Sequence, residues 1–199
     1  TALAEGLSEE IVTGLSRFSY LRVLARSSTS RLGSGAVDVQ RLGQEIGARY
    51  VMEGSLRQAG ARVRAAVQLT DAATGAHLWA ETYERPFGAD EVFALQDDLV
   101  ARIVSAVADQ HGVLPHSMSA LIRNKSNEQL TPLEAVLRVF SFHERMSPEE
   151  HRNVRTLLER VVREHPDEAD CWAMLATLYA DEYMFGFEGE PDPLARAQK

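Results

Sequence analysis

The sequence predicts an α+β fold, in which a small, mostly antiparallel sheet with flanking helices is followed by an all-α region of helical repeats. Between Ala48 and Pro86, apolar and polar residues alternate with the two-residue period of strands that have one buried face. Elsewhere, apolar residues recur every three to four positions, which is the period of a helix with one buried face. Helices interleaved with an antiparallel sheet indicate the α+β class.

Three strands are expected within this alternating stretch. The first two begin at Tyr50 and Arg62, and the turn between them, residues 58–61, contains a glycine and is short enough for a hairpin. A longer loop over residues 71–75 leads to the third strand, Ala76–Tyr83. The two-residue period places four side chains of this strand on one face: His77, Trp79, Glu81 and Tyr83.

A fourth strand and three helices are predicted around the meander. Leu21–Arg26 has the alternation of a short strand. Asp38 and Asp90 are expected to cap the starts of two helices, and Gly47 supplies the left-handed residue that ends the first of these. The helices are expected over residues 2–17, 38–46 and 90–110.

The same runs resemble the amino-terminal domain of TolB and its relatives. The resemblance rests on AEGLSEEIVTGLSRF, LRVLARSS, the alternating stretch and FALQDDLVARIV, which together cover most of residues 4–104. In bacteria such a domain is often joined to tetratricopeptide repeats and appended to adenylate cyclase domains or winged-helix regulators. The resemblance therefore implies a regulatory or scaffolding module without an active site. It also implies one more strand before Thr1, without which a sheet edge would be open to self-association.

The second half of the chain has the start signals of several helices. Thr131-Pro132 and Ser147-Pro148 each combine an N-cap residue with a proline at the first helical position. Farther on, the spacing of apolar residues matches the first helix of a tetratricopeptide repeat. The expected repeat-packing residues are Pro166, Trp172, Leu175, Ala176 and Tyr179. Trp172 is expected to be a buried ring and Cys171 a small core residue.

These signals divide the chain into three parts. We expect a first domain over residues 1–111, a linker over residues 112–131 and incomplete tetratricopeptide-like repeats over residues 132–199. Stacked helix pairs need neighbours to bury their faces, so the chain is expected to be a fragment of a longer protein. The single cysteine excludes an internal disulfide.

The formal net charge of −8 is unevenly distributed. Residues 1–90 contain ten Lys and Arg and ten Asp and Glu, whereas residues 91–199 contain eleven and nineteen. An acidic second half argues against a nucleic-acid surface there, because phosphate binding needs concentrated Lys and Arg. No apolar run approaches the ~20 residues of a membrane span. We therefore expect a cytoplasmic location, or a periplasmic one if a membrane span lies upstream.

No set of residues has the spacing of a catalytic, metal or cofactor site. The six histidines lack metal-ligand spacing, and Gly33 and Gly35 do not follow the strand-to-helix pattern of a phosphate-binding loop. An adenylate cyclase would need paired Asp residues to hold metal ions. Asp97 and Asp98 point roughly 100° apart on a helix, which suits a solvated surface. We expect no cofactor and no catalytic residue in this chain.

Two groups of side chains are candidates for recognition. Arg57, Arg62 and Arg64 cluster on the first hairpin and could bind an acidic partner; the other interpretation is a solvated face whose arginines pair with Glu53 and Glu81. Trp79, together with His77 and Tyr83, could stack on a ligand; the other interpretation is that these side chains pack under a helix or cover a face of the sheet.

The sequence thus favours a non-catalytic regulatory module of a bacterial signalling protein. The helical repeats would bind a protein or peptide, and the first domain would couple that binding to an output domain outside the chain. A homodimer is also left open. Two alternatives are cyclic AMP synthesis by an upstream cyclase domain and small-ligand sensing by the first domain.

Overall fold

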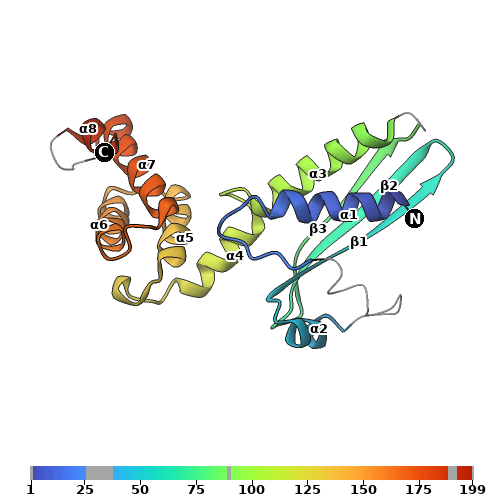
Figure 1. Ribbon diagram of the computed structural model, residues 1–199, viewed down its shortest axis with the longest axis horizontal. Coiled ribbons are helices and arrows are strands. Elements are labelled where there is room, and N and C mark those ends of the chain that lie inside the picture. Colours follow the sequence, from blue (N-terminus) through green and yellow to red (C-terminus); the bar gives the residue numbers. More distant parts are fainter. Residues whose placement is uncertain (1, 26–37, 89–90, 188–191, 199) are drawn as a thin grey trace. The chain divides into compact units, whose positions relative to one another are not determined.

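A computed structural model describes residues 2–25, 38–88, 91–187 and 192–198. The chain forms two compact units, Thr1–Asp109 and Gln110–Lys199. The first contains a three-stranded antiparallel sheet with helices, and the described part of the second is helical (Figure 1). The predicted fold class is therefore confirmed.

The sheet of the first unit is an antiparallel meander in the order β1-β2-β3. Its strands are β1 (Tyr50–Ala59), β2 (Arg62–Asp71) and β3 (Ala76–Pro86). Gly60, with φ of 57°, makes the β1–β2 turn in the left-handed region that glycine adopts without steric cost. In the described residues the outer edges of β1 and β3 are paired with no further strand.

Three helices accompany the sheet: α1 (Ala2–Leu15), α2 (Val39–Ile46) and α3 (Val92–Ala108). Asp38 caps α2 as predicted, because its carboxylate accepts from the backbone N–H groups of Gln40 and Arg41. Gly47 ends α2 with φ of 69°, also as predicted. The predicted cap Asp90 and the glycines Gly33 and Gly35 lie outside the described residues.

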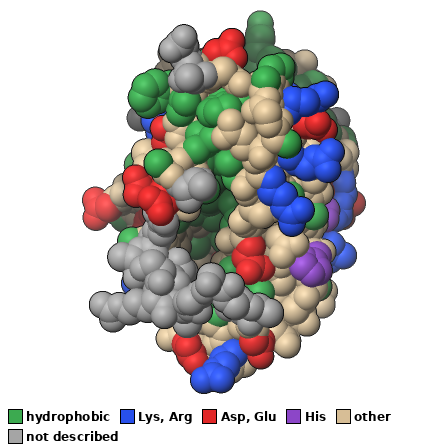
Figure 2. Space-filling view, turned by 90° about the vertical axis from the view of Figure 1, so that its right-hand side faces the viewer, with side chains coloured by type: hydrophobic (Ala, Val, Ile, Leu, Met, Phe, Trp, Pro, Cys, Tyr) green, Lys and Arg blue, Asp and Glu red, His purple; other side chains and the backbone are tan. Residues whose placement is uncertain are grey.

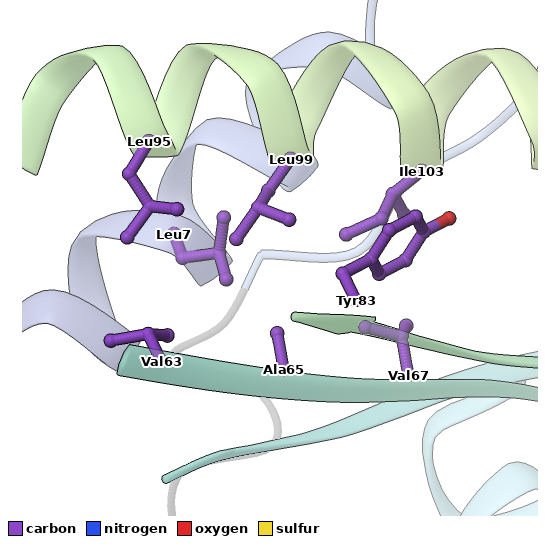
Figure 3. Close-up of a cluster of buried hydrophobic side chains, with 8 residues drawn as sticks. All are labelled: Leu7, Val63, Ala65, Val67, Tyr83, Leu95, Leu99 and Ile103. Atoms are coloured by element: carbon purple, nitrogen blue, oxygen red, sulfur yellow. The ribbon is translucent and has the colours of Figure 1, made fainter. Parts of the chain in front are cut away.

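The core of the first unit lies between α1, α3 and one face of the sheet. Figure 3 shows Leu95, Leu99 and Ile103 of α3 directed toward the sheet, where the side chains of β2 meet them. Leu99 is 1% exposed and Ile103 is fully buried. The full set of core residues is Leu7, Val63, Ala65, Val67, Tyr83, Leu95, Leu99 and Ile103.

The second face of the sheet is covered at one end. There α2 packs on it through a small cluster of Leu42, Val51 and Ala72. Toward the β1–β2 turn, this face carries exposed Ser55 and Arg57 of β1 and Arg62 and Arg64 of β2. The sheet therefore has one apolar face and one face that is largely polar.

The predicted strand over Leu21–Arg26 is wrong for residues 21–25, which have no strand partner; Arg26 lies outside the described residues. The chain turns before this segment, where the N–H of Leu21 donates to the carbonyl of Phe18 at 3.0 Å. Tyr20 then fixes it to the end of α3 through a hydrogen bond from its hydroxyl to the Ala108 carbonyl. Alternation over six residues could not distinguish such an anchored extended segment from a strand.

A β-bulge in β3 corrects the predicted position of His77. Leu69 faces Trp79 across the β2–β3 pair, but Thr70 faces His77, so Leu78 is an extra residue. His77 consequently lies on the polar face, where its Nδ1 is 3.4 Å from the hydroxyl of Thr70. Trp79, Glu81 and Tyr83 share the other face, as expected.

The second unit consists of α4 (Val113–Ile122), a 3₁₀ turn η4 (Asn127–Gln129), α5 (Pro132–His143), α6 (Pro148–Glu164), α7 (Ala169–Phe185) and α8 (Pro193–Ala197). The predicted helix starts are confirmed. Thr131 and Glu134 form a reciprocal capping box at α5, and the Ser147 hydroxyl accepts from the N–H of Glu150 at α6. Helix α4 packs on α5 in this unit; the linker limits at residues 112 and 131 stay predictions.

Candidate functional site

The polar face of the sheet gathers three arginines near the β1–β2 turn. Arg57 lies directly opposite Arg64 in the β1–β2 register, and Arg62 is two residues from Arg64 on the same face. Like charges directly opposite each other repel, so this arrangement favours a nearby anion. Figure 2 shows Lys and Arg side chains gathered on one side of the surface that it draws.

Glu84 of β3 supplies that anion. Its carboxylate lies 3.1 Å from Nε of Arg62 and 3.2 Å from Nη2 of Arg64. The predicted partners Glu53 and Glu81 are wrong. Glu53 accepts from Gln68, and Glu81 points to the helical face of the sheet. This carboxylate thus pairs with two of the three guanidinium groups in the cluster.

A second candidate surface is a shallow, open hollow of about 600 Å³ between β3 and α3. Glu81 and Tyr83 line it from the strand, and Asp98, Arg102 and Ser105 line it from the helix. Nε of Arg102 is 2.7 Å from one oxygen of Asp98, and Nε of Arg85 is 2.9 Å from the other. Hydrogen bonds from Arg102 and then from Arg85 lower the pKa of Asp98.

Asp98 is therefore bound to two guanidinium groups, while Asp97 beside it is exposed. The described part of the chain contains no group of three or more His, Cys, Asp or Glu side chains placed to hold a metal ion. The hollow is lined by both acidic and basic side chains, which come from β3 and from α3.

The hydroxyl of Tyr83 donates to Glu81 at 2.9 Å in this hollow. Burial and the Glu81 carboxylate raise the pKa of Tyr83 from 10.0 to about 12. Because the pKa of Tyr83 is higher in the folded state than in the unfolded state, the protonated hydroxyl stabilises the fold. This stabilisation is complete below pH 10 and is lost as the pH rises toward 12.

We expect Tyr83→Phe to remove that pH-dependent loss, so the urea midpoint of the variant should fall less steeply than that of the unchanged chain between pH 9 and pH 12. Tyr183→Phe, at a 65% exposed position, is the matched control, and equal slopes for both variants would contradict the assignment.

The predicted repeat-packing residues divide between core and surface. Leu175 and Tyr179 of α7 are buried, at 4% and 6% exposure, and Cys171 is buried as expected. The expectation that Trp172 is buried is wrong, because its side chain is 45% exposed. Its indole N–H instead donates to the backbone carbonyl of the exposed Pro166 at 2.9 Å, which ties the ring to the α6–α7 turn. Ala176 is half-buried.

A buried polar network between α5, α6 and α7 was missed by sequence reasoning. Nε2 of His143 donates to Oδ2 of Asp181 at 3.0 Å. Nη1 of Arg155 lies 2.6 Å from Oε1 of Glu182, whose side chain is 1% exposed. His143 and Asp181 are 38 positions apart in the sequence, and Arg155 and Glu182 are 27 apart. No local sequence pattern could therefore predict these pairs.

His151 is the fifth polar side chain of this network. It is 1% exposed, and its Nε2 donates to the carbonyl of Leu178 at 2.9 Å. Its Nδ1 is 3.9 Å from Oε1 of Glu182. The second oxygen of Glu182 is buried without a hydrogen-bond partner in the described residues. The network therefore fixes how α7 sits on the two preceding helices.

The end of α7 carries three consecutive exposed apolar side chains. They are Tyr183 at 65%, Met184 at 68% and Phe185 at 52% exposure. Consecutive exposed aromatic and Met side chains of this kind are enriched at protein interfaces.

None of the helices in the described ranges is long and apolar enough to cross a bilayer.

The first unit is thus a three-stranded antiparallel meander packed with helices, and a helical unit follows it in the sequence. Residues 1–102 match the second domain of HilA/YgeH-like transcriptional regulators, and the chain belongs to this family. It is also similar to the protein named "Putative adenylate cyclase 3" of Rhizobium meliloti (strain 1021), with 33% identity over 207 aligned residues. That alignment covers 98% of this chain and 32% of the relative, so the chain spans about a third of the curated relative's length.

Proposed function

We propose that this chain is a non-catalytic accessory module that binds a protein or peptide and relays the binding to an output domain elsewhere in a longer protein. The observation that carries the proposal is the kind of proteins in which the module occurs. One is a family of transcriptional regulators, and the other is a relative named as a cyclase. A part shared by proteins with such different outputs supplies something other than the output chemistry.

The two units offer surfaces of different chemistry for this role. In the first unit, three arginines and one glutamate form a polar, net positive face suited to an acidic segment. In the second unit, the exposed Tyr183, Met184 and Phe185 are suited to an apolar helix or peptide. We infer a first unit of TolB amino-terminal type and a second built from tetratricopeptide-like helix pairs, supported by the buried Leu175 and Tyr179 at repeat spacing.

The similarity to a cyclase relative favours one particular output, cyclic AMP synthesis, for the longer protein. In that case the catalytic machinery lies outside these residues. Asp97 and Asp98 do not provide it, because Asp98 is bound to Arg85 and Arg102 and Asp97 points away on the helix surface.

Incubation of the purified chain with ATP and Mg²⁺ or Mn²⁺ tests the proposal directly. We expect no cyclic AMP above a no-protein control, whereas the longer protein lacking residues 1–199 should keep its basal output. The matched variants are Asp97→Asn and Asp98→Asn. Turnover by the isolated chain that these variants abolish would show an active site here and would overturn the accessory role.

A further inference from the structure

A cleft of about 180 Å³ lies between α4 and α5 in the second unit, and we call it the α4–α5 cleft. Its lining residues recur three to four positions apart along each helix, so one stripe of α4 faces one stripe of α5. Ser119, Ala120 and Ser141 have small side chains, which leave space where closely packed helices usually place larger apolar ones. Ser119 is buried there, and its hydroxyl donates to the Leu137 carbonyl at 3.0 Å.

Three arginines line this cleft, and in the described residues none has a carboxylate within hydrogen-bond distance. Arg123, at the end of α4, is exposed, and its guanidinium has no partner there. Arg145 lies 3.8 Å from Glu150, which is longer than a hydrogen bond. Arg138 donates through Nη2 to two backbone carbonyls near the end of α4, each at 3.0 Å, while its Nε is buried without a partner. The cleft therefore has donor capacity that the described chain does not use.

Two glutamates also line the cleft without neutralising it. Oε1 of Glu144 is 3.1 Å from Nδ1 of His116, and Glu150 lies beside Arg145 at the longer distance given above. Three guanidinium groups and two carboxylates leave one net positive charge when His116 is neutral. This local excess lies in the acidic half of the chain, where Asp and Glu outnumber Lys and Arg by nineteen to eleven.

We propose that the α4–α5 cleft binds a phosphate monoester group. Such a group carries about 1.5 to 2 negative charges at pH 7 and three acceptor oxygens, so it can engage several guanidinium groups at once. A carboxylate offers one charge and two oxygens, which suits the cleft less because two carboxylates already line it. The volume is below that of pockets for drug-sized ligands, so the group comes from a small phosphorylated metabolite or from a phosphorylated side chain. The site does not depend on the proposed function.

Calorimetric titration of the chain with glycerol 2-phosphate, at constant ionic strength, tests the site. We expect one saturable site. Arg123→Gln and Arg145→Gln should each weaken binding at least about tenfold, because each removes a hydrogen bond between two charged groups. Arg152→Gln, at an exposed position of α6 outside the cleft, makes the same change in net charge and should leave the affinity unchanged. Equal losses for all three variants would show non-specific attraction and would overturn the proposal.

Glu150→Gln separates recognition of the anion from a structural effect, because it should change the affinity in the opposite direction. The substitution removes the carboxylate nearest to Arg145 and with it the repulsion of the phosphate, so glycerol 2-phosphate should bind several-fold more tightly. Weaker binding by this variant would contradict the assignment.

A phosphoserine peptide, titrated beside glycerol 2-phosphate, identifies the source of the group. Binding of the peptide at least about tenfold more tightly would indicate a phosphorylated protein, and equal or weaker binding would indicate a small metabolite. Acetate should not displace either probe at equal concentration. Displacement by acetate as effective as that by the ester, or no saturable binding of either probe, would refute a phosphate site.

Discussion

Arg155→Leu is expected to destabilise the second unit by about 3–5 kcal/mol, because it leaves a buried carboxylate without its partner. Nη1 of Arg155 lies 2.6 Å from Glu182, whose side chain is 1% exposed. Removing both charges with Arg155→Leu and Glu182→Leu together should recover most of that loss, since paired charges in a core can be replaced by apolar groups of similar volume. Urea unfolding at pH 8 measures the change under conditions in which a free histidine is neutral.

The matched control for this prediction is Arg152→Leu, an exposed arginine on the same helix. It should change the free energy of unfolding by less than about 0.5 kcal/mol. The Trp79→Phe background leaves Trp172 as the single tryptophan, so fluorescence then reports the second unit alone. A loss below about 1 kcal/mol for Arg155→Leu would mean that Glu182 is satisfied without this arginine.

Leu99→Ala is expected to cost the first unit about 2–5 kcal/mol, through lost apolar burial and the cavity left behind. Leu99 is 1% exposed and lies in the middle of the row that α3 directs onto β2 (Figure 3). Leu7 of α1 and Tyr83 of β3 belong to the same buried cluster as Leu99. Because this core is closely packed, the surrounding side chains can move little to fill the cavity left by the substitution. Urea unfolding in a Trp172→Phe background, followed through Trp79, measures this unit separately.

Phe93→Ala is the control on the same helix, at a side chain that is 78% exposed. Its effect should be several-fold smaller although the residue is larger, because no cavity forms at the surface. Equal losses for Leu99→Ala and Phe93→Ala would indicate that α3 is rotated relative to the sheet.

Local chemistry made most of the fold predictable from sequence. Asp38, Thr131 and Ser147 act on backbone groups within three residues, so their capping roles can be derived without knowing the fold. Gly47 depends on its own φ angle in the same way. The alternation of β1 and β2 also survives, because their register contains no irregularity.

The errors arise where distant parts of the chain decide the outcome. Trp172 has repeat spacing, but the carbonyl of Pro166 holds its ring at the surface. The pairing of Arg62 and Arg64 with Glu84 depends on the register of β3, which sequence cannot fix to one residue. Arg155 and Glu182 become neighbours when α6 and α7 pack, and the hollow beside Tyr83 exists once α3 crosses β3.

The bulge at Leu78 makes β3 two half-strands of opposite phase. Before it, His77 belongs to the polar face; after it, Trp79 and Tyr83 belong to the core. Any relative that lacks one residue here must either turn its aromatic residues outward or carry the histidine position on the core side. When a relative is aligned with this chain, the residues before Leu78 and the residues after it must therefore be matched separately. If a one-residue gap were placed elsewhere in β3, the alignment would assign the intervening side chains to the wrong face of the sheet.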